Sequence, residues 1–141
     1  MSDVPQSTDW HMLIGGEWVD ALDGSRADII TPIDRNVIIA RVPNGKAEDA
    51  DRAVKAARAA FPAWSGLHFK ERQKMLTKCA DALEANIETL AELTALDTGN
   101  AKRTQARPEA TMLSEIFRYF GGVAGEVKGN TLPAGEQQLN Y

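Results

Sequence analysis

The chain has 141 residues and a formal net charge of −4, with 43% hydrophobic and 26% charged residues. These proportions are typical of a globular protein, and the acidic balance excludes the basic surface of a general nucleic-acid binder. No apolar run approaches the roughly 18 residues that cross a bilayer, and the N-terminus lacks the basic and apolar regions of a secretory signal. We therefore expect no nucleic-acid partner, no membrane partner and a cytoplasmic location. The single cysteine, Cys79, cannot form an internal disulfide, which fits that compartment.

Strand-forming residues fill the first third of the chain. Residues 1–9 are polar, and we expect them to be flexible. The Gly15-Gly16 pair lies between apolar residues and suits the two-residue turn of a β-hairpin. Runs of β-branched residues predict two more strands, the first of which ends at Pro32 because proline cannot donate to a ladder. The predicted strand regions are residues 11–20, 28–31 and 37–42.

Beyond these strands the apolar residues recur with helical spacing, which predicts three or four amphipathic helices. Pro62 is expected to stop the first helix, which has Asp49 on its polar face. Gly99 should end a longer helical stretch, and a break near Ala85-Asn86 would divide that stretch in two. The predicted helices begin near Ala47, Lys70 and Pro108.

The apolar residues of these helices form stripes that we expect to be buried. Cys79 lies in the stripe of the long helical stretch, where a cysteine acts as a small hydrophobe rather than a nucleophile. The stripe of the last helix has five positions: Leu113, Ile116, Phe117, Phe120 and Ala124. The short hairpin-like pieces cannot form a substantial sheet, so the helices need something else to cover. The sequence therefore predicts an α-rich layer of a larger body.

The tripeptide Asp97-Thr98-Gly99 also carries the catalytic acid in aspartic proteases. In those enzymes it follows a strand and precedes Ser or Ala, whereas here the preceding residues favour a helix and Asn100 follows. His11 and His68 have no neighbours at metal-ligand spacing, and no glycine-rich nucleotide-binding motif occurs. The residues alone therefore predict no catalytic chemistry.

Four segments occur together in the order and spacing of a known family. They are "IGGEWV", "AVKAARAAFPAW", "LDTG" and "FRYFGGVAGEVKGNTLP". Through them residues 12–141 resemble the N-terminal portion of an NAD(P)-dependent aldehyde dehydrogenase. The resemblance implies an α/β fold in which residues 10–141 form the N-terminal part of the cofactor-binding domain. The hairpin strands and amphipathic helices would wrap a Rossmann-like domain and end at the start of the oligomerisation arm, and the catalytic domain would be absent.

The family's chemistry is the oxidation of an aldehyde to a carboxylic acid with NAD or NADP, through a thiohemiacetal on a cysteine and a glutamate that activates water. No position of this chain matches that cysteine, that glutamate or the cofactor-binding lysine. We therefore expect no catalytic or cofactor-binding residue and no turnover by the 141 residues alone, and a homo-oligomer only for the full-length enzyme. The alternative is a truncated, non-catalytic remnant or an interaction module. Asn100-Ala101 and Val123 depart from the family's usual residues and leave the aldehyde unassigned.

The resemblance also implies a site for a monovalent cation such as potassium. Its ligands would be the backbone carbonyls of Ile29 and Ile30 and the carboxylate of Asp97. Oxygen ligands suit hard cations. The alternative, in which Asp97 only caps its helix and forms local hydrogen bonds, is equally compatible with the sequence.

Overall fold

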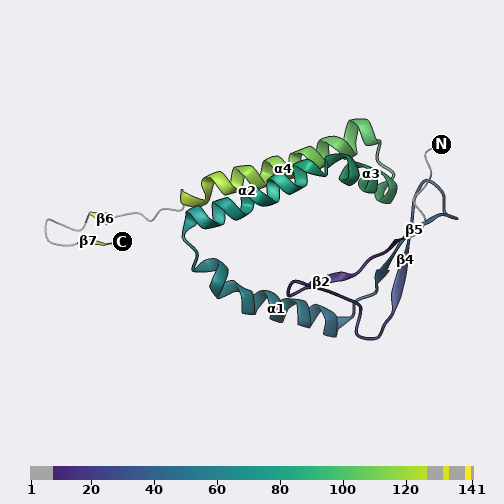
Figure 1. Ribbon diagram of the computed structural model, residues 1–141, viewed down its shortest axis with the longest axis horizontal. Helices are drawn as coiled ribbons and strands as arrows, with labels where there is room; N and C mark the ends of the chain where they lie inside the picture. The colour runs from purple at the N-terminus through teal and green to yellow at the C-terminus, as the bar shows by residue number, and fades with distance from the viewer. Residues whose placement is uncertain (1–7, 127–131, 134–138, 141) are drawn as a thin grey trace.

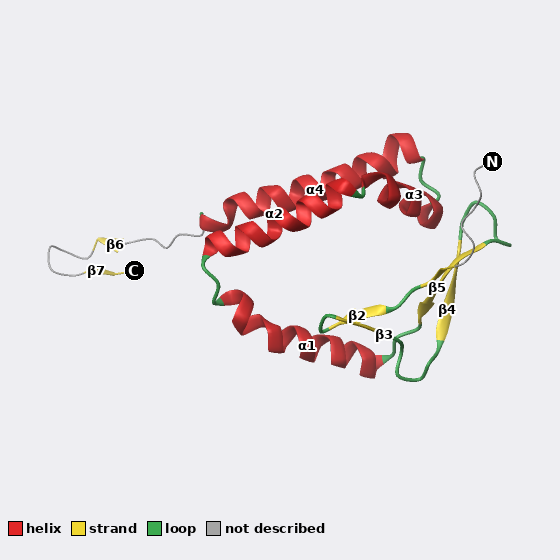
Figure 2. Cartoon of the chain, viewed as in Figure 1, coloured by secondary structure: helices red, strands yellow, loops and turns green. Residues whose placement is uncertain are grey.

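A computed structural model describes residues 8–126, 132–133 and 139–140 of the chain (Figure 1). The strands are β1 (Thr8–Asp9), β2 (Met12–Ile14), β3 (Glu17–Val19), β4 (Arg26–Ile30), β5 (Ile38–Pro43), β6 (Leu132–Pro133) and β7 (Leu139–Asn140). The helices are α1 (Ala47–Ser65), α2 (Phe69–Ala85), α3 (Ile87–Thr98) and α4 (Arg107–Gly122), with a π-turn at Lys102–Ala106 and a 3₁₀ turn at Val123–Gly125. Strands therefore precede the helices, and the small β6–β7 pair follows them (Figure 2). The other residues after Glu126 lie outside the described part of the chain.

The N-terminal strands form two small sheets. β2 and β3 pair as an antiparallel hairpin, and its turn confirms the prediction because Gly15 and Gly16 have φ values of 64° and 89°. The second sheet has the order β1-β5-β4, with β4 antiparallel and β1 parallel to β5. Thr8 and Asp9 therefore belong to a strand, unlike the flexible segment predicted for residues 1–9, of which residues 1–7 lie outside the described part.

The helix ends follow the predictions except at Pro62. Gly99 ends α3 with φ 76°, and Asn86 separates α2 from α3, as predicted. The prediction that Pro62 stops the first helix is wrong, because α1 continues to Ser65. A proline in the last turn removes only its own N–H, and its carbonyl still accepts a hydrogen bond from the Gly66 N–H at 3.0 Å.

The N-terminus of α1 is tied to the loop after β3 by one buried carboxylate. Asp49 is 2% exposed, although the helical pattern placed it on the polar face. Its oxygens accept hydrogen bonds from the backbone N–H of Leu22 at 3.1 and 3.4 Å and of Lys46 at 3.1 Å. Arg52 donates a further bond at 3.1 Å. An acid at the third helical position is a known capping signal, but the bond to Leu22, which lies 27 residues away, is not visible in a local pattern.

The two longest C-terminal helices, α2 and α4, lie side by side and antiparallel (Figure 1). Four small residues of these two helices are buried: Ala80, Ala110, Ser114 and Gly121. A Cβ built on Gly121 would lie 3.4 Å from the Leu76 Cβ and 3.5 Å from the Gln73 carbonyl oxygen. The backbones therefore approach closely because no large side chain separates them.

The predicted burial of the apolar stripes is wrong for most of their large residues. Of the stripe on α4, Phe120 is 58% exposed, and Leu113 and Ile116 are exposed as well. Cys79 of α2 is also exposed. Periodicity correctly indicates an apolar face, but burial needs an element on that face, and the described residues place none there.

Ion pairs join the helices at the surface. Arg118 of α4 pairs with Asp81 and Glu84 of α2. Arg107 donates to both carboxylate oxygens of Glu88 at 2.6 and 2.9 Å, and these hydrogen bonds lower the pKa of Glu88 below its usual range. Such exposed pairs orient the helices and contribute little stability each.

The described residues contain no core of large side chains. Every buried hydrophobic residue is an alanine. The chain has an accessible surface of 10786 Å², whereas a compact monomer of 15.4 kDa has about 7,200 Å². The architecture is thus an open layer, and none of the helices in the described part of the chain is both long and apolar enough to cross a membrane.

Candidate functional site

The three residues predicted to bind a cation lie on two segments. Ile29 and Ile30 are the last residues of β4, where the ladder to β5 changes register, and Asp97 lies in the last turn of α3. The two segments meet just beyond these residues, since a Cβ built on Gly99 would lie 3.0 Å from the Cγ of Pro32. The structure thus brings the end of α3 against the turn that follows β4.

Asp97 does not cap its own helix. Its side chain is exposed and forms no hydrogen bond or ion pair with any described residue. Local bonds at this helix end come from its neighbour: the Thr98 hydroxyl donates to the Thr94 carbonyl at 2.7 Å and accepts from the Asn100 N–H at 3.2 Å. The local capping role considered for Asp97 is therefore taken by Thr98.

The histidines do not form a metal centre. His11 lies 3.0 Å from an Asp20 carboxylate oxygen, and the Nδ1 of His68 accepts the Lys70 N–H at 3.3 Å at the start of α2. No group of three or more His, Cys, Asp or Glu side chains within the described residues could hold a metal ion. Any cation at the β4–α3 corner would therefore depend on backbone carbonyls together with Asp97.

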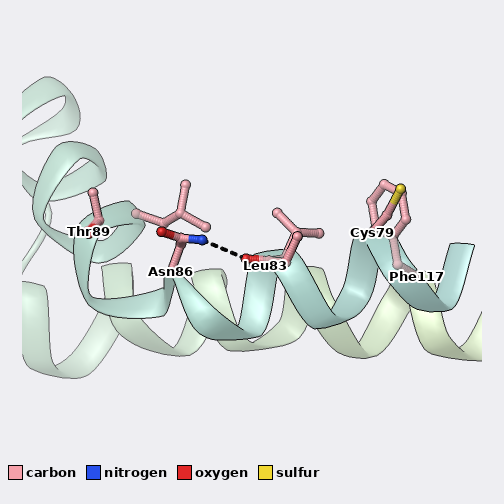
Figure 3. A pocket seen from close by; sticks show the side chains of 7 residues that line it. Cys79, Leu83, Asn86, Thr89 and Phe117 are labelled. Carbon is pink, nitrogen blue, oxygen red and sulfur yellow. Dashed lines mark hydrogen bonds between the residues drawn. The ribbon is translucent and has the colours of Figure 1, made fainter.

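A separate feature is an apolar groove of about 500 Å³ on α2, α3 and α4 (Figure 3). It is lined by Cys79, Ala82, Leu83, Asn86, Thr89, Leu90 and Phe117. The side-chain amide of Asn86 donates a hydrogen bond to the Ala82 carbonyl oxygen at 2.8 Å, so this polar group of the lining already has a partner. Among these lining residues there is no acid or base that could activate the Cys79 thiol, so the groove has the chemistry of a contact surface and not of an active site.

Comparison with known proteins explains this arrangement. The model of the aldehyde dehydrogenase family matches residues 18–141. The chain belongs to the aldehyde dehydrogenase family. Aldehyde dehydrogenase 1 of Tanacetum cinerariifolium is 42% identical over 123 residues, which are 86% of this chain and 24% of that protein.

Solved structures of aldehyde dehydrogenases have the same fold over this segment. The NAD-dependent aldehyde dehydrogenase of Sinorhizobium meliloti has a TM-score of 0.92 and 31% identity, covering 99% of this chain and 28% of its own. The NAD⁺ complex of the Bacillus cereus aldehyde dehydrogenase has a TM-score of 0.88 and 33% identity, covering 94% and 27%. The chain thus spans about a quarter of the length of these relatives. The predicted fold, the N-terminal part of an aldehyde dehydrogenase, is confirmed.

Proposed function

We propose that the chain is the N-terminal segment of an enzyme that oxidises an aldehyde to a carboxylic acid with NAD or NADP. The observation that supports this most directly is the TM-score of 0.92 over 99% of the chain against an NAD-dependent aldehyde dehydrogenase. When bound, the nicotinamide accepts a hydride from the substrate. This segment contributes the outer layer of the cofactor-binding domain, while the attacking thiolate and the water-activating carboxylate belong to the rest of the enzyme. A cytoplasmic location and a homo-oligomeric full-length enzyme are parts of the same proposal.

A chimera tests this proposal. Residues 1–141 would replace the matching N-terminal segment of the Bacillus cereus enzyme, and NADH formation with an aldehyde would be followed by absorbance. We expect the isolated chain to show no turnover and the chimera to oxidise the aldehyde, because the described residues contain no activated nucleophile but have the family fold. Turnover by the isolated chain, or a folded chimera without activity, would contradict the proposal.

The alternative function is an interaction module that acts without catalysis, and the exposed groove on α2, α3 and α4 favours it. The coding sequence downstream of Tyr141 distinguishes the two functions. An open reading frame that continues into the remaining three-quarters of an aldehyde dehydrogenase supports the enzyme. An immediate stop codon supports the interaction module.

We further propose that potassium binds at the β4–α3 corner through the carbonyls of Ile29 and Ile30 and the carboxylate of Asp97. Two features support this. The end of α3 meets the turn after β4 at Gly99 and Pro32, and the Asp97 side chain forms no hydrogen bond or ion pair with any described residue. In the chimera, KCl should raise the unfolding free energy relative to choline chloride at equal ionic strength. A gain of about 1.4 kcal/mol is expected at ten times the dissociation constant.

The Asp97→Ala variant of the chimera should lose most of this potassium-specific gain. Glu92→Gln is the matched control, because Glu92 is an exposed acid on the same helix that pairs with Lys102 at 3.5 Å. Equal potassium responses in both variants and in the parent chimera would show that Asp97 is no ligand.

A further inference from the structure

The loop between β5 and α1 contains an asparagine followed by a glycine, Asn44-Gly45. Of the six asparagines in the sequence, this is the one that precedes a glycine. Both residues are exposed, and neither the Asn44 side-chain amide nor the Gly45 N–H forms a hydrogen bond with any residue in the described part of the chain. The Asn44 main chain is held by Ser25, whose carbonyl accepts the Asn44 N–H at 2.9 Å and whose hydroxyl donates to the Asn44 carbonyl at 3.3 Å. The loop therefore fixes the main chain but leaves the side-chain amide and the next N–H unengaged.

These two groups are the reactants of a known rearrangement of asparagine. Gly45 has no Cβ to crowd its nitrogen, so this nitrogen can approach the Asn44 Cγ closely. Solvent base removes the Gly45 N–H proton, a bond forms between the nitrogen and the Cγ, and the Cγ–Nδ2 bond breaks to release ammonia. Water then opens the resulting imide at one of its two carbonyl carbons. The product is aspartate or isoaspartate, and nothing is oxidised or reduced.

We propose that Asn44-Gly45 is a site of spontaneous deamidation in the folded protein, and that its isoaspartate product weakens the anchor of α1 at Asp49. The main chain of isoaspartate passes through the side-chain carbons and is one atom longer. The Lys46 N–H, two residues further on, donates to the buried Asp49 carboxylate at 3.1 Å. The added atom displaces this donor from a carboxylate that the Leu22 N–H also holds. The inference does not depend on the proposed enzymatic function.

Peptide mapping by mass spectrometry measures deamidation at each asparagine of one sample. The chain of residues 1–141 and its chimera with the Bacillus cereus enzyme would be incubated at neutral pH, folded and in urea. Asn36 and Asn86 are internal controls, because their side-chain amides donate hydrogen bonds and a β-branched residue follows each. Asn44 should convert about tenfold faster than either control, and within about threefold of its own rate in urea. Equal rates at the three asparagines, or strong protection of Asn44 by folding, would overturn the proposal.

Gly45→Ala tests the role of the unshielded nitrogen. Gly45 does not have a left-handed conformation, and a Cβ there would lie 3.4 Å from the Sδ of Met12, a flexible side chain, so alanine should be tolerated. Conversion of Asn44 should slow by about fivefold or more, because the added methyl group crowds the attacking nitrogen. An unchanged rate would refute the attack by the Gly45 nitrogen. The comparison in urea decides the question even if the variant fails to fold.

Urea unfolding of the aged chimera measures the effect on α1. The isoaspartate form, separated by chromatography, should have a folded-to-unfolded ratio about fivefold lower than the fresh protein, because a hydrogen bond to the buried Asp49 is lost. Asn44→Asp is the matched control, since it has the same new charge on a main chain of normal length, and it should keep the ratio of the fresh protein. An unchanged ratio in the isoaspartate form, or an equal loss in Asn44→Asp, would overturn the proposed weakening of the anchor.

Discussion

Replacing Asp49 by alanine is expected to lower the free energy of unfolding of the chimera by about 3 kcal/mol. The carboxylate is 2% exposed and accepts hydrogen bonds from Leu22, Lys46 and Arg52. Its removal leaves the two backbone N–H groups without their acceptor and frees the loop after β3 from the start of α1. Urea unfolding followed by circular dichroism would measure the change.

Asp51→Ala is the control for this experiment. Asp51 lies two residues further along the same helix, and its exposed ion pair with Lys55 should contribute less than about 1 kcal/mol. Asp49→Asn should give an intermediate loss, because the amide oxygen can keep one of the backbone hydrogen bonds. Equal losses in Asp49→Ala and Asp51→Ala would show that the buried carboxylate does not anchor α1.

The second large effect is expected at Gly99, where alanine should cost about 2 kcal/mol in the same measurement. The residue has φ 76°, a left-handed conformation that alanine adopts only with strain. A Cβ at this position would also lie 3.0 Å from the Cγ of Pro32, and a proline ring has little freedom to move away. Both effects would loosen the contact between the end of α3 and the turn after β4.

Gly122→Ala provides the comparison for Gly99→Ala. Gly122 has φ −62°, and a Cβ built there meets nothing within 4 Å. Alanine at the end of α4 should therefore be neutral or stabilise by up to about 1 kcal/mol. If both glycines gave the same change, the cost at Gly99 could not be assigned to its conformation or to Pro32.

Local sequence signals predicted the elements of this fold well where one residue type decides the conformation. The Gly15-Gly16 turn, the break at Asn86 and the stop at Gly99 all follow from backbone preferences of single residues. The parallel pairing of Thr8 with Ala40 could not be predicted from the sequence. A two-residue strand is too short to show a periodic pattern, and its partner strand is distant in the chain. The π-turn at Lys102–Ala106 was missed for a similar reason: its residues are ordinary helix formers.

Burial could not be predicted from periodicity in this chain. The large residues of the α4 stripe, such as Phe120, are exposed, while the small Ser114 and Gly121 are buried. An apolar stripe indicates that a helix face will be covered, but the covering element is absent from the described residues. Residue size is therefore a poor guide to which positions pack inside this segment.

The candidate cation site came from resemblance to a family and not from local pattern. Ile29 and Asp97 are 68 positions apart in the sequence, and only the folded chain brings their segments together through Gly99 and Pro32. The groove was also invisible in the sequence as a groove, since its lining comes from three helices. Helical spacing placed Cys79 and Phe117 on apolar stripes but did not single out Ala82 or Asn86, and the meeting of the stripes depends on how α4 lies on α2.

The open apolar layer has a consequence for synthesis of the proposed full-length enzyme on the ribosome. The 123 aligned residues are 24% of the Tanacetum cinerariifolium protein, so the proposed full-length enzyme, at that size, would have about 510 residues, of which about 370 would follow residue 141. At roughly 5–20 residues per second, this segment would then wait about 20–75 s before the last of that further chain emerges. Throughout that interval side chains such as Trp18 and Phe61 face water. The nascent chain should therefore be a client of chaperones that bind apolar segments during translation.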